Sequence, residues 1–369
     1  MVKKWNKCNI FDGAFQGKRV LVTGHTGFKG AWLTLWLTEL GAEVAGFSKY
    51  FPSEPCLFNV LGLKKKIKHF QGDVCDQAQL TKVFRDFKPQ IVFHLAAQPI
   101  VRTAYQDPKL TFDTNLGGTV NVLECIRSST DIKAAVIITS DKCYENLSIQ
   151  RGYHEDDRLG GEDPYSASKA CAEIAFSSYF RSFFSHQDCL HIATARAGNV
   201  IGGGDWAKDR IIPDCVRAWS KKQTAIIRNP QATRPWQHVL EPVSGYLWLG
   251  ANLLKKELNG ESFNFGPRYR ASHDVKEVVD LFLKFWGEGT WQHVAGASKK
   301  EAMLLQLSPV KTQKKLHWTS TLSFKETVEL TAKWYQAYYS KKTDILDFSY
   351  QQIEHFVIKA REHGQVWAK

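Results

Sequence analysis

The chain has 369 residues, of which 43% are hydrophobic and 23% charged, an ordinary composition for a soluble globular enzyme. At this length we expect one large α/β domain with a smaller partner domain. The formal net charge of +12 raises the question of nucleic-acid binding, but the basic residues are scattered and the longest run is Lys-Lys-Lys at residues 64–66. A basic surface also suits an anionic small substrate such as a nucleotide diphosphate, which is the partner we expect instead of nucleic acid.

The cysteine pattern and the first residues do not fit a secreted protein. The eight cysteines form no C-x-x-C pair and no metal-like cluster, so we expect reduced thiols in a cytoplasmic protein without a metal site. Residues 1–7 carry charge with no apolar core behind them, which does not fit a secretory signal peptide. No stretch approaches 18 consecutive apolar residues, so no membrane-spanning helix and no membrane partner is expected.

A glycine-rich loop follows the first predicted strand. Residues 18–23 are apolar enough for a short buried strand, and residues 31–40 predict a helix. The loop between them has the spacing G-x-x-G-x-x-G, in the order that a dinucleotide site needs, with pyrophosphate at the helix N-terminus. We therefore expect a Rossmann-type doubly wound parallel sheet that binds NAD. The candidate cofactor residues here are Gly24, Thr26, Gly27, Phe28, Lys29 and Gly30.

The next two strands bear on the choice of cofactor. The second strand covers residues 41–48, and an acidic residue at its end usually holds the ribose 2′-hydroxyl and selects NAD over NADP. Ser48 and Lys49 stand there instead, so this position leaves NAD and NADP both open. The third strand ends in Gly72, Asp73 and Val74, and the last two are candidate cofactor residues. Asp73 can accept a hydrogen bond from the adenine amino group; alternatively, it caps the next helix.

The fourth strand, residues 89–98, ends in small residues that let the backbone pass close to a ligand. The candidates are Leu95, Ala96 and Ala97 for the cofactor and Gln98 for the substrate. His94 lies inside an apolar run, so we interpret it as a satisfied core histidine rather than a catalytic one. Residues 111–125 predict a helix containing Asn115, a residue type that is unfavourable in helix interiors. We expect Asn115 to bond main chain near the active site and count it among the cofactor residues.

The centre of the predicted chemistry is a strand over residues 134–140 that ends in Ser140 and is followed by Asp141 and Lys142. Ligands in such sheets bind beyond the carboxyl ends of strands, which favours a site over an exposed turn. Farther on, Tyr165 and Lys169 are four residues apart and share one helix face. The ammonium is expected to lower the tyrosine's pKa from its usual value of about 10. Together these residues suggest proton transfer beside a hydride acceptor.

Polar residues after a further strand, residues 191–197, extend the predicted pocket. Asn199, Trp206 and Arg210 suit phosphate or base contacts, and Arg234 suits a bidentate clamp on a diphosphate. Asn264, in a short strand, is expected to face the same pocket. Helical patterns over residues 275–285, 324–339 and 350–363 predict a small, mostly helical lid domain.

These motifs resemble extended short-chain dehydrogenases that act on nucleotide sugars. The resemblance rests on TGHTGFKG at 23–30, HLAAQ at 94–98, SDK at 140–142 and the Tyr-x-x-x-Lys pair. Within that group, TSDKCYEN at 139–146, RAGNVIGGGDW at 196–206 and RPWQHVLEP at 234–242 are similar to the CDP-glucose 4,6-dehydratases. The likeness runs from about residue 17 to 267 and continues more loosely to about 339.

The resemblance implies dehydration of CDP-D-glucose to CDP-4-dehydro-6-deoxy-D-glucose, feeding deoxysugar and O-antigen biosynthesis, with tightly bound NAD regenerated in each cycle. Tyr165 would take the 4-hydroxyl proton, Lys169 would bond the nicotinamide ribose, and Ser140 would bond the 4-oxygen. Asp141, protonated, would be the acid for the leaving 6-hydroxyl. Relatives acting on dTDP-glucose carry glutamate at the place of Lys142, so this lysine is either a neutral C5 base or an electrostatic stabiliser of the enolate.

The resemblance also implies a homodimer formed through the helix of Tyr165 and the helix before it. We predict an NAD-binding domain from residues 14–198 and 236–262, interleaved with a nucleotide-sugar-binding domain from residues 199–235 and 263–369. Three alternatives stay open. They are a dTDP-, GDP- or UDP-sugar 4,6-dehydratase, a nucleotide-sugar 4-epimerase, which has no use for an acid beside the serine, and a non-catalytic NAD-sensing protein, which typically lacks the tyrosine or the lysine.

Overall fold

A seven-stranded parallel sheet forms the centre of the molecule in the computed structural model, which describes residues 7–149, 151–267, 272–294 and 305–369. The strand order is β11-β6-β5-β4-β1-β2-β3, so the order reverses between β1 and β4 and places a ligand cleft beyond their carboxyl ends. The predicted Rossmann-type sheet is confirmed. Its strands are β1 Arg19–Thr23, β2 Glu43–Ser48, β3 Lys68–Gln71, β4 Ile91–His94, β5 Ala134–Ile138, β6 His191–Ala197 and β11 Ser262–Phe265.

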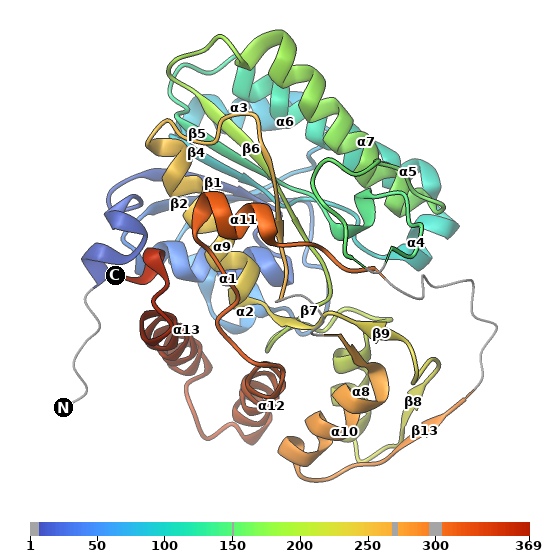
Figure 1. Cartoon of the computed structure of the whole chain (residues 1–369). Helices are drawn as coiled ribbons and strands as arrows, with labels where there is room; N and C mark the ends of the chain where they lie inside the picture. The colour runs from blue at the N-terminus through green and yellow to red at the C-terminus, as the bar shows by residue number, and fades with distance from the viewer. Residues whose placement is uncertain (1–6, 150, 268–271, 295–304) are drawn as a thin grey trace.

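Helices cover both faces of this sheet (Figure 1). One face carries α3 Gln77–Phe87, α6 Gly118–Arg127 and α7 Pro164–Tyr179, and the other carries α1 Phe28–Glu39 and α9 Leu240–Leu254. Every residue of β4 and β5 is buried as a result, which explains why these strands read as continuous apolar runs instead of alternating patterns.

The C-terminal region is largely helical, as predicted, and gathers beyond the carboxyl edge of the sheet (Figure 1). It contains α8 Ile211–Trp219, α10 Val275–Trp286 and α12 Phe324–Ser340, with a small pair of strands, β8 Ala225–Ile227 and β13 Trp291–His293. No helix of the described ranges is long and apolar enough to cross a membrane. Residues 1–6, on which the expectation of no signal peptide rests, lie outside the described residues.

The last helix, α13 Ile345–Glu362, and the final turn η6 Val366–Ala368 return to the Rossmann half. The Trp367 ring stacks on Phe11 at 5.0 Å and meets Trp36 of α1 edge-on at 6.0 Å. The predicted domain boundaries stay a prediction, but this turn packs against the cofactor half rather than acting as a lid.

Two local predictions differ from the structure. The helix predicted over 111–125 is divided into α5 Pro108–Phe112, a π-helical turn η3 Asp113–Gly117 and α6, and Asn115 lies in that turn. The alternative that Asp73 caps the following helix is wrong, because the Asp76 carboxylate accepts the Gln79 N–H at 3.0 Å and caps α3. The remaining short elements are η1 Lys7–Gly13, α2 Leu57–Val60, η2 Leu63–Lys65, α4 Val101–Gln106, η4 Asp141–Cys143, η5 Phe180–Phe184, β7 Val200–Ile201, β9 Thr233–Arg234, β10 Gln237–His238, β12 His273–Asp274 and α11 Val310–Leu316.

Candidate active site

A cavity of about 1070 Å³ opens at the carboxyl ends of the central strands, between the glycine loop and the C-terminal elements. Most of the residues predicted from the sequence line it, so the cofactor and substrate candidates share one space. The lining candidates are Gly24, Thr26, Gly27, Phe28, Lys29, Gly30, Asp73, Val74, Leu95, Ala96, Ala97, Gln98, Ser140, Asp141, Lys142, Tyr165, Lys169, Asn199, Arg210 and Arg234.

Trp206 and Asn264 do not line this cavity, and the prediction that they face it is wrong. Trp206 is buried among aromatic rings, with centroids 5.7 Å from Trp334 and 4.9 Å from Tyr338. The Asn264 side-chain oxygen accepts the Tyr144 hydroxyl at 2.9 Å in a buried polar network. A polar residue type in a loop or strand end indicates a possible contact, but not the direction in which the side chain points.

Asn115 also lies outside the lining but supports it from behind. Its amide oxygen accepts the Gln98 N–H at 2.8 Å, and its amide nitrogen donates to the Ser168 hydroxyl on α7 at 2.9 Å. It therefore bonds main chain beside the cavity, as predicted, and does not itself enter it.

Threonine hydroxyls meet both ring nitrogens of His94, and burial lowers its pKa to about 3. His94 is thus a satisfied core histidine, as predicted.

The glycine loop has the shape that a dinucleotide requires. A Cβ atom on Gly30 would lie 2.2 Å from the backbone oxygen of Gly24, so α1 can begin directly under the loop only with glycine at that position. Gly24 itself has φ +74°, and a Cβ there would meet the backbone nitrogen of Ala96 at 2.6 Å. The loop backbone and the amino end of α1 consequently reach the cavity uncovered, where N–H groups suit a pyrophosphate.

The adenosine end of the cavity carries a charge pair. Lys49, which follows β2, lies 2.7 Å from the Asp73 carboxylate beyond β3. Burial favours a higher pKa for Asp73, but the hydrogen bonds from Lys49 and Cys75 and the Lys49 charge together outweigh it and hold the pKa below its ordinary value. Asp73 is therefore an ionised acceptor that lines the site.

Ser140 and Asp141 form a compact unit at the end of β5. The Ser140 hydroxyl donates to one Asp141 oxygen at 2.9 Å and accepts the Lys142 N–H at 3.2 Å. The other Asp141 oxygen lies 3.5 Å from the Asn199 side-chain nitrogen. Asp141 is only 4% exposed, so the alternative of a solvent-exposed turn is wrong for this residue. Its carboxyl group shares the cavity with Tyr165.

The helix that carries Tyr165 and Lys169 has a fixed start. The Asp163 carboxylate accepts the N–H groups of Tyr165 at 2.9 Å and Ser166 at 3.0 Å, which caps α7. Burial raises the pKa of Tyr165 to about 12, against a hydrogen bond with Ser140 that lowers it. The expectation that Lys169 lowers this pKa is wrong, because desolvation dominates at both groups. Burial lowers the pKa of Lys169 to about 8.

Several buried groups next to the cavity were missed from the sequence. Tyr246 on α9 lies 3.4 Å from the Lys29 ammonium, whose pKa burial lowers to about 8. Glu173 on α7 and Arg196 on β6 form a buried ion pair. Arg196 could have been found as a charged residue in a buried strand, which needs a partner, whereas nothing in the sequence marks Glu173 or Tyr246.

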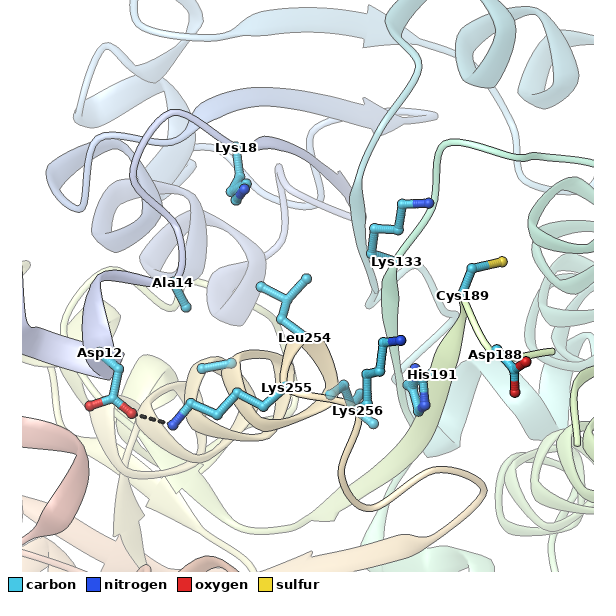
Figure 2. Close-up of a pocket in the computed structure, with 12 residues that line it drawn as sticks. Asp12, Ala14, Lys18, Lys133, Asp188, Cys189, His191, Leu254, Lys255 and Lys256 are labelled. Carbon is cyan, nitrogen blue, oxygen red and sulfur yellow. Dashed lines mark hydrogen bonds and ion pairs between the residues drawn. The ribbon is translucent and has the colours of Figure 1, made fainter.

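A second pocket, of about 600 Å³, lies at the opposite, amino-terminal edge of the sheet (Figure 2). Lys18 and Lys133, directly before β1 and β5, line it together with His191, the first residue of β6. Lys255 is hydrogen-bonded to Asp12 within it. No site residue predicted from the sequence lines this pocket, so the proposed chemistry belongs to the carboxyl edge.

Comparison with known proteins gives a consistent result. Residues 21–331 match the family model described as GDP-mannose 4,6 dehydratase. The chain is 44% identical over 349 residues to the CDP-glucose 4,6-dehydratase of Salmonella typhimurium, covering 93% of this chain and 97% of that protein. Two solved structures share the fold. One is the epimerase Mth375 of Methanothermobacter thermautotrophicus, with a TM-score of 0.77 and 24% identity, covering 91% of this chain and 98% of that one. The other is the dTDP-glucose 4,6-dehydratase of Bacillus anthracis in complex with NAD, with a TM-score of 0.73 and 21% identity, covering 87% of this chain and 97% of that one. The chain therefore belongs to the GDP-mannose 4,6-dehydratase family, the nucleotide-sugar dehydratases of the short-chain dehydrogenase superfamily.

Proposed function

We propose that this protein dehydrates CDP-D-glucose to CDP-4-dehydro-6-deoxy-D-glucose. The observation that carries the proposal is the buried carboxyl group of Asp141, hydrogen-bonded to Ser140 and lining the same cavity as Tyr165. A 4-epimerase needs the tyrosine, lysine and serine but has no elimination step that would use this acid. The Salmonella typhimurium relative, which bears the name of this activity, supports the choice of the CDP sugar.

We propose NAD as the resident cofactor. The glycine loop leaves no room for a Cβ at Gly24 or Gly30 and fits a pyrophosphate, while Asp73 suits the adenine amino group. Tyr165 and Lys169 would hold the nicotinamide ribose. When bound there, NAD would supply the hydride acceptor for C4 of the sugar and the hydride donor for C6.

The residues of the chain supply the proton transfers. The Tyr165 oxygen takes the 4-hydroxyl proton, and the Ser140 hydroxyl beside it holds the 4-oxygen in place. The resulting 4-ketone acidifies the C5 proton. Asp141 then gives a proton to the leaving 6-hydroxyl, which departs as water. Lys142, which lines the same cavity, takes the C5 proton or stabilises the enolate by its charge. A proton returns to C5 when C6 is reduced, which completes the 6-deoxy product.

Basic side chains line the part of the cavity beyond the sheet and suit the diphosphate. Arg210 is held at 3.0 Å from Asp205, and Arg234 donates to the backbone oxygen of Thr233 at 2.8 Å. The test of the base is turnover of CDP-, dTDP-, UDP- and GDP-glucose by the purified protein, read as the 4-keto chromophore in alkali. CDP-glucose is expected to give the highest kcat/KM; a preference for another base would overturn that part of the proposal.

We expect kcat/KM to rise with pH and to level off near pH 8. The rise reports conversion of Tyr165, whose pKa is about 12, to its basic form. The levelling off reports Lys169, whose pKa is about 8, because above that pH the gain in basic Tyr165 is offset by the loss of charged Lys169. Lys169→Arg keeps the charge and should let kcat/KM go on rising above pH 10. If kcat/KM still levels off near pH 8 in that variant, another group causes it, such as Lys29, whose pKa is also about 8.

Gly198→Ala is expected to lower product formation by about 10²-fold, because a 1 Å misplacement of a reacting group costs about that much. A Cβ on Gly198 would lie 2.0 Å from the Asp141 carboxylate, which would have to move. The measurement is the steady-state rate with thermal unfolding as a check on the fold. Gly117→Ala is the control, since a Cβ there meets nothing within 4 Å. Equal rates for the parent and Gly198→Ala would show that the position of Asp141 does not matter.

We also propose a cytoplasmic homodimer serving deoxysugar and O-antigen biosynthesis. Among the described residues, three large apolar side chains on or near α7 are exposed: Ile174 (55%), Phe183 (44%) and Leu110 (37%). Ile174 lies on α7 and Leu110 on α5, which packs against α7, so a second copy can cover both. Light scattering of the parent and of Ile174→Glu tests this, with a dimer expected for the parent and a monomer for the variant.

A further inference from the structure

A buried ion pair lies behind the reacting groups without lining the cavity. Arg196 of β6 binds Glu173 of α7 in a two-pronged arrangement, with Nη2–Oε2 at 2.8 Å and Nε–Oε1 at 2.9 Å. The two side chains are 3% and 1% exposed. Two charges removed from water in this way carry a desolvation cost, so net stability alone does not account for the pair.

The Glu173 carboxylate joins the segments that carry the catalytic candidates. It accepts hydrogen bonds from the hydroxyls of Thr139, directly before Ser140 and Asp141, and of Thr194 on β6, the latter at 2.9 Å. Glu173 itself lies one helical turn beyond Lys169 on α7. A single carboxylate thus connects the helix of the proton acceptor with the strand end of the proposed acid.

Arg196 extends the connection to the loop after Lys142. Its Nη1 donates to the Tyr144 hydroxyl at 2.6 Å and to the backbone oxygen of Glu155 at 3.0 Å. The Tyr144 hydroxyl in turn donates to the Asn264 side-chain oxygen on β11 at 2.9 Å. This is the network in which Asn264 is used, away from the cavity. It anchors the loop that follows the reacting residues at two points, Tyr144 and Glu155.

We propose that Glu173 and Arg196 are a positioning pair that sets the placement of Tyr165 and Lys169 relative to Asp141, and that the Glu173 carboxylate acts on the Lys169 ammonium one helical turn away. The inference rests on the proposed function, because it assigns the pair to that chemistry. Neither residue touches the cavity, so both act through others.

The charge environment of Lys169 supports the second half of this inference. Burial lowers its pKa to about 8, and the Glu173 carboxylate is the largest influence in the opposite direction, followed by Cys143 beyond β5. Lys29 from α1 and His94 at the end of β4 also interact electrostatically with Lys169, and burial keeps His94 neutral. Removing the Glu173 charge is therefore expected to lower the pKa of Lys169 further, so that the amine loses its proton at a lower pH.

The first test measures Lys169 directly in Glu173→Gln. Competitive acylation with acetic anhydride across a pH series, read by mass spectrometry at the Lys169 peptide, reports the midpoint at which the amine becomes neutral. We expect the midpoint to fall below that of the parent, at about pH 8. Glu124→Gln, the same change in an exposed ion pair on α6, is the matched control and should leave the midpoint unchanged. An unchanged midpoint in folded Glu173→Gln would overturn the inference.

The second test separates positioning from folding. Breaking a buried pair by removing one partner leaves an unpaired charge, so the double variant Glu173→Gln/Arg196→Gln, which removes both charges, accompanies the single one. We expect kcat to fall about 10²-fold in whichever variant is folded by circular dichroism, with KM changed little. Glu173→Asp should recover part of kcat and the parent midpoint. Parent-like kcat in a folded variant would overturn the positioning role.

These outcomes are distinct from failure of the proposed function. If the parent turns over none of the four nucleotide-glucose substrates, the proposed activity is wrong. The acylation midpoint still measures the link between Glu173 and Lys169, because it needs neither substrate nor cofactor.

Discussion

Tyr165→Phe is expected to lower kcat by about 10²–10⁴-fold, the range for losing a positioned proton-transfer group. Tyr165 is only 8% exposed, and phenylalanine keeps the packing of its ring, so the fold should be preserved. What is lost is the oxygen that takes the 4-hydroxyl proton. The measurement is formation of the 4-keto product under saturating nucleotide sugar, because loss of a proton acceptor should act on kcat and leave KM nearly unchanged.

Tyr179→Phe on the same helix is the control for Tyr165→Phe, since Tyr179 does not line the cavity. Parent-like turnover by Tyr165→Phe would show that the Tyr165 phenol takes no part in the proton transfer and would overturn its assigned role.

Asp141→Asn should separate the two halves of the reaction. An amide keeps the shape of the buried side chain but cannot protonate the leaving 6-hydroxyl, so formation of the 6-deoxy product should fall about 10²–10⁴-fold. Oxidation at C4 and removal of the C5 proton depend on Tyr165, Ser140 and Lys142 and should persist. Exchange of the C5 hydrogen with solvent deuterium, followed by mass spectrometry of recovered substrate, measures them.

A substrate analogue sharpens the test of Asp141. Fluoride leaves without prior protonation far more readily than hydroxide, so the nucleotide sugar with fluorine in place of the 6-hydroxyl should be turned over by parent and Asp141→Asn at similar rates. If the fluorinated substrate is as slow as the natural one in the variant, Asp141 has a role other than acid, such as holding Ser140, to which it is bonded at 2.9 Å.

The sequence correctly predicted the features that depend only on residues close together in the chain. The apolar run of β5, the glycine loop before α1 and the Tyr-x-x-x-Lys spacing each depend on neighbouring residues, and each lies where it was expected. Side-chain direction at the ends of irregular segments depends on the tertiary fold, which is why Trp206 and Asn264 were placed wrongly.

Electrostatics posed a different difficulty for sequence-based prediction. Spacing showed that Tyr165 and Lys169 share a helix face but not how deeply both are buried, and burial reverses the expected pKa shift of the tyrosine. The pairing of Glu173 with Arg196 joins a helix to a strand that is distant in the chain, so composition revealed only two isolated charges.

The aromatic contact of the final turn η6 connects the C-terminal residues to α1, the helix next to the glycine loop. Trp367 lies against Trp36, and Trp36 belongs to α1, whose opposite end supports the glycine loop. Trimming the tail to obtain better crystals would therefore loosen the helix on which the dinucleotide rests. An affinity tag at the same end should not displace the Trp367 ring from Trp36, so a long spacer is preferable to a direct fusion.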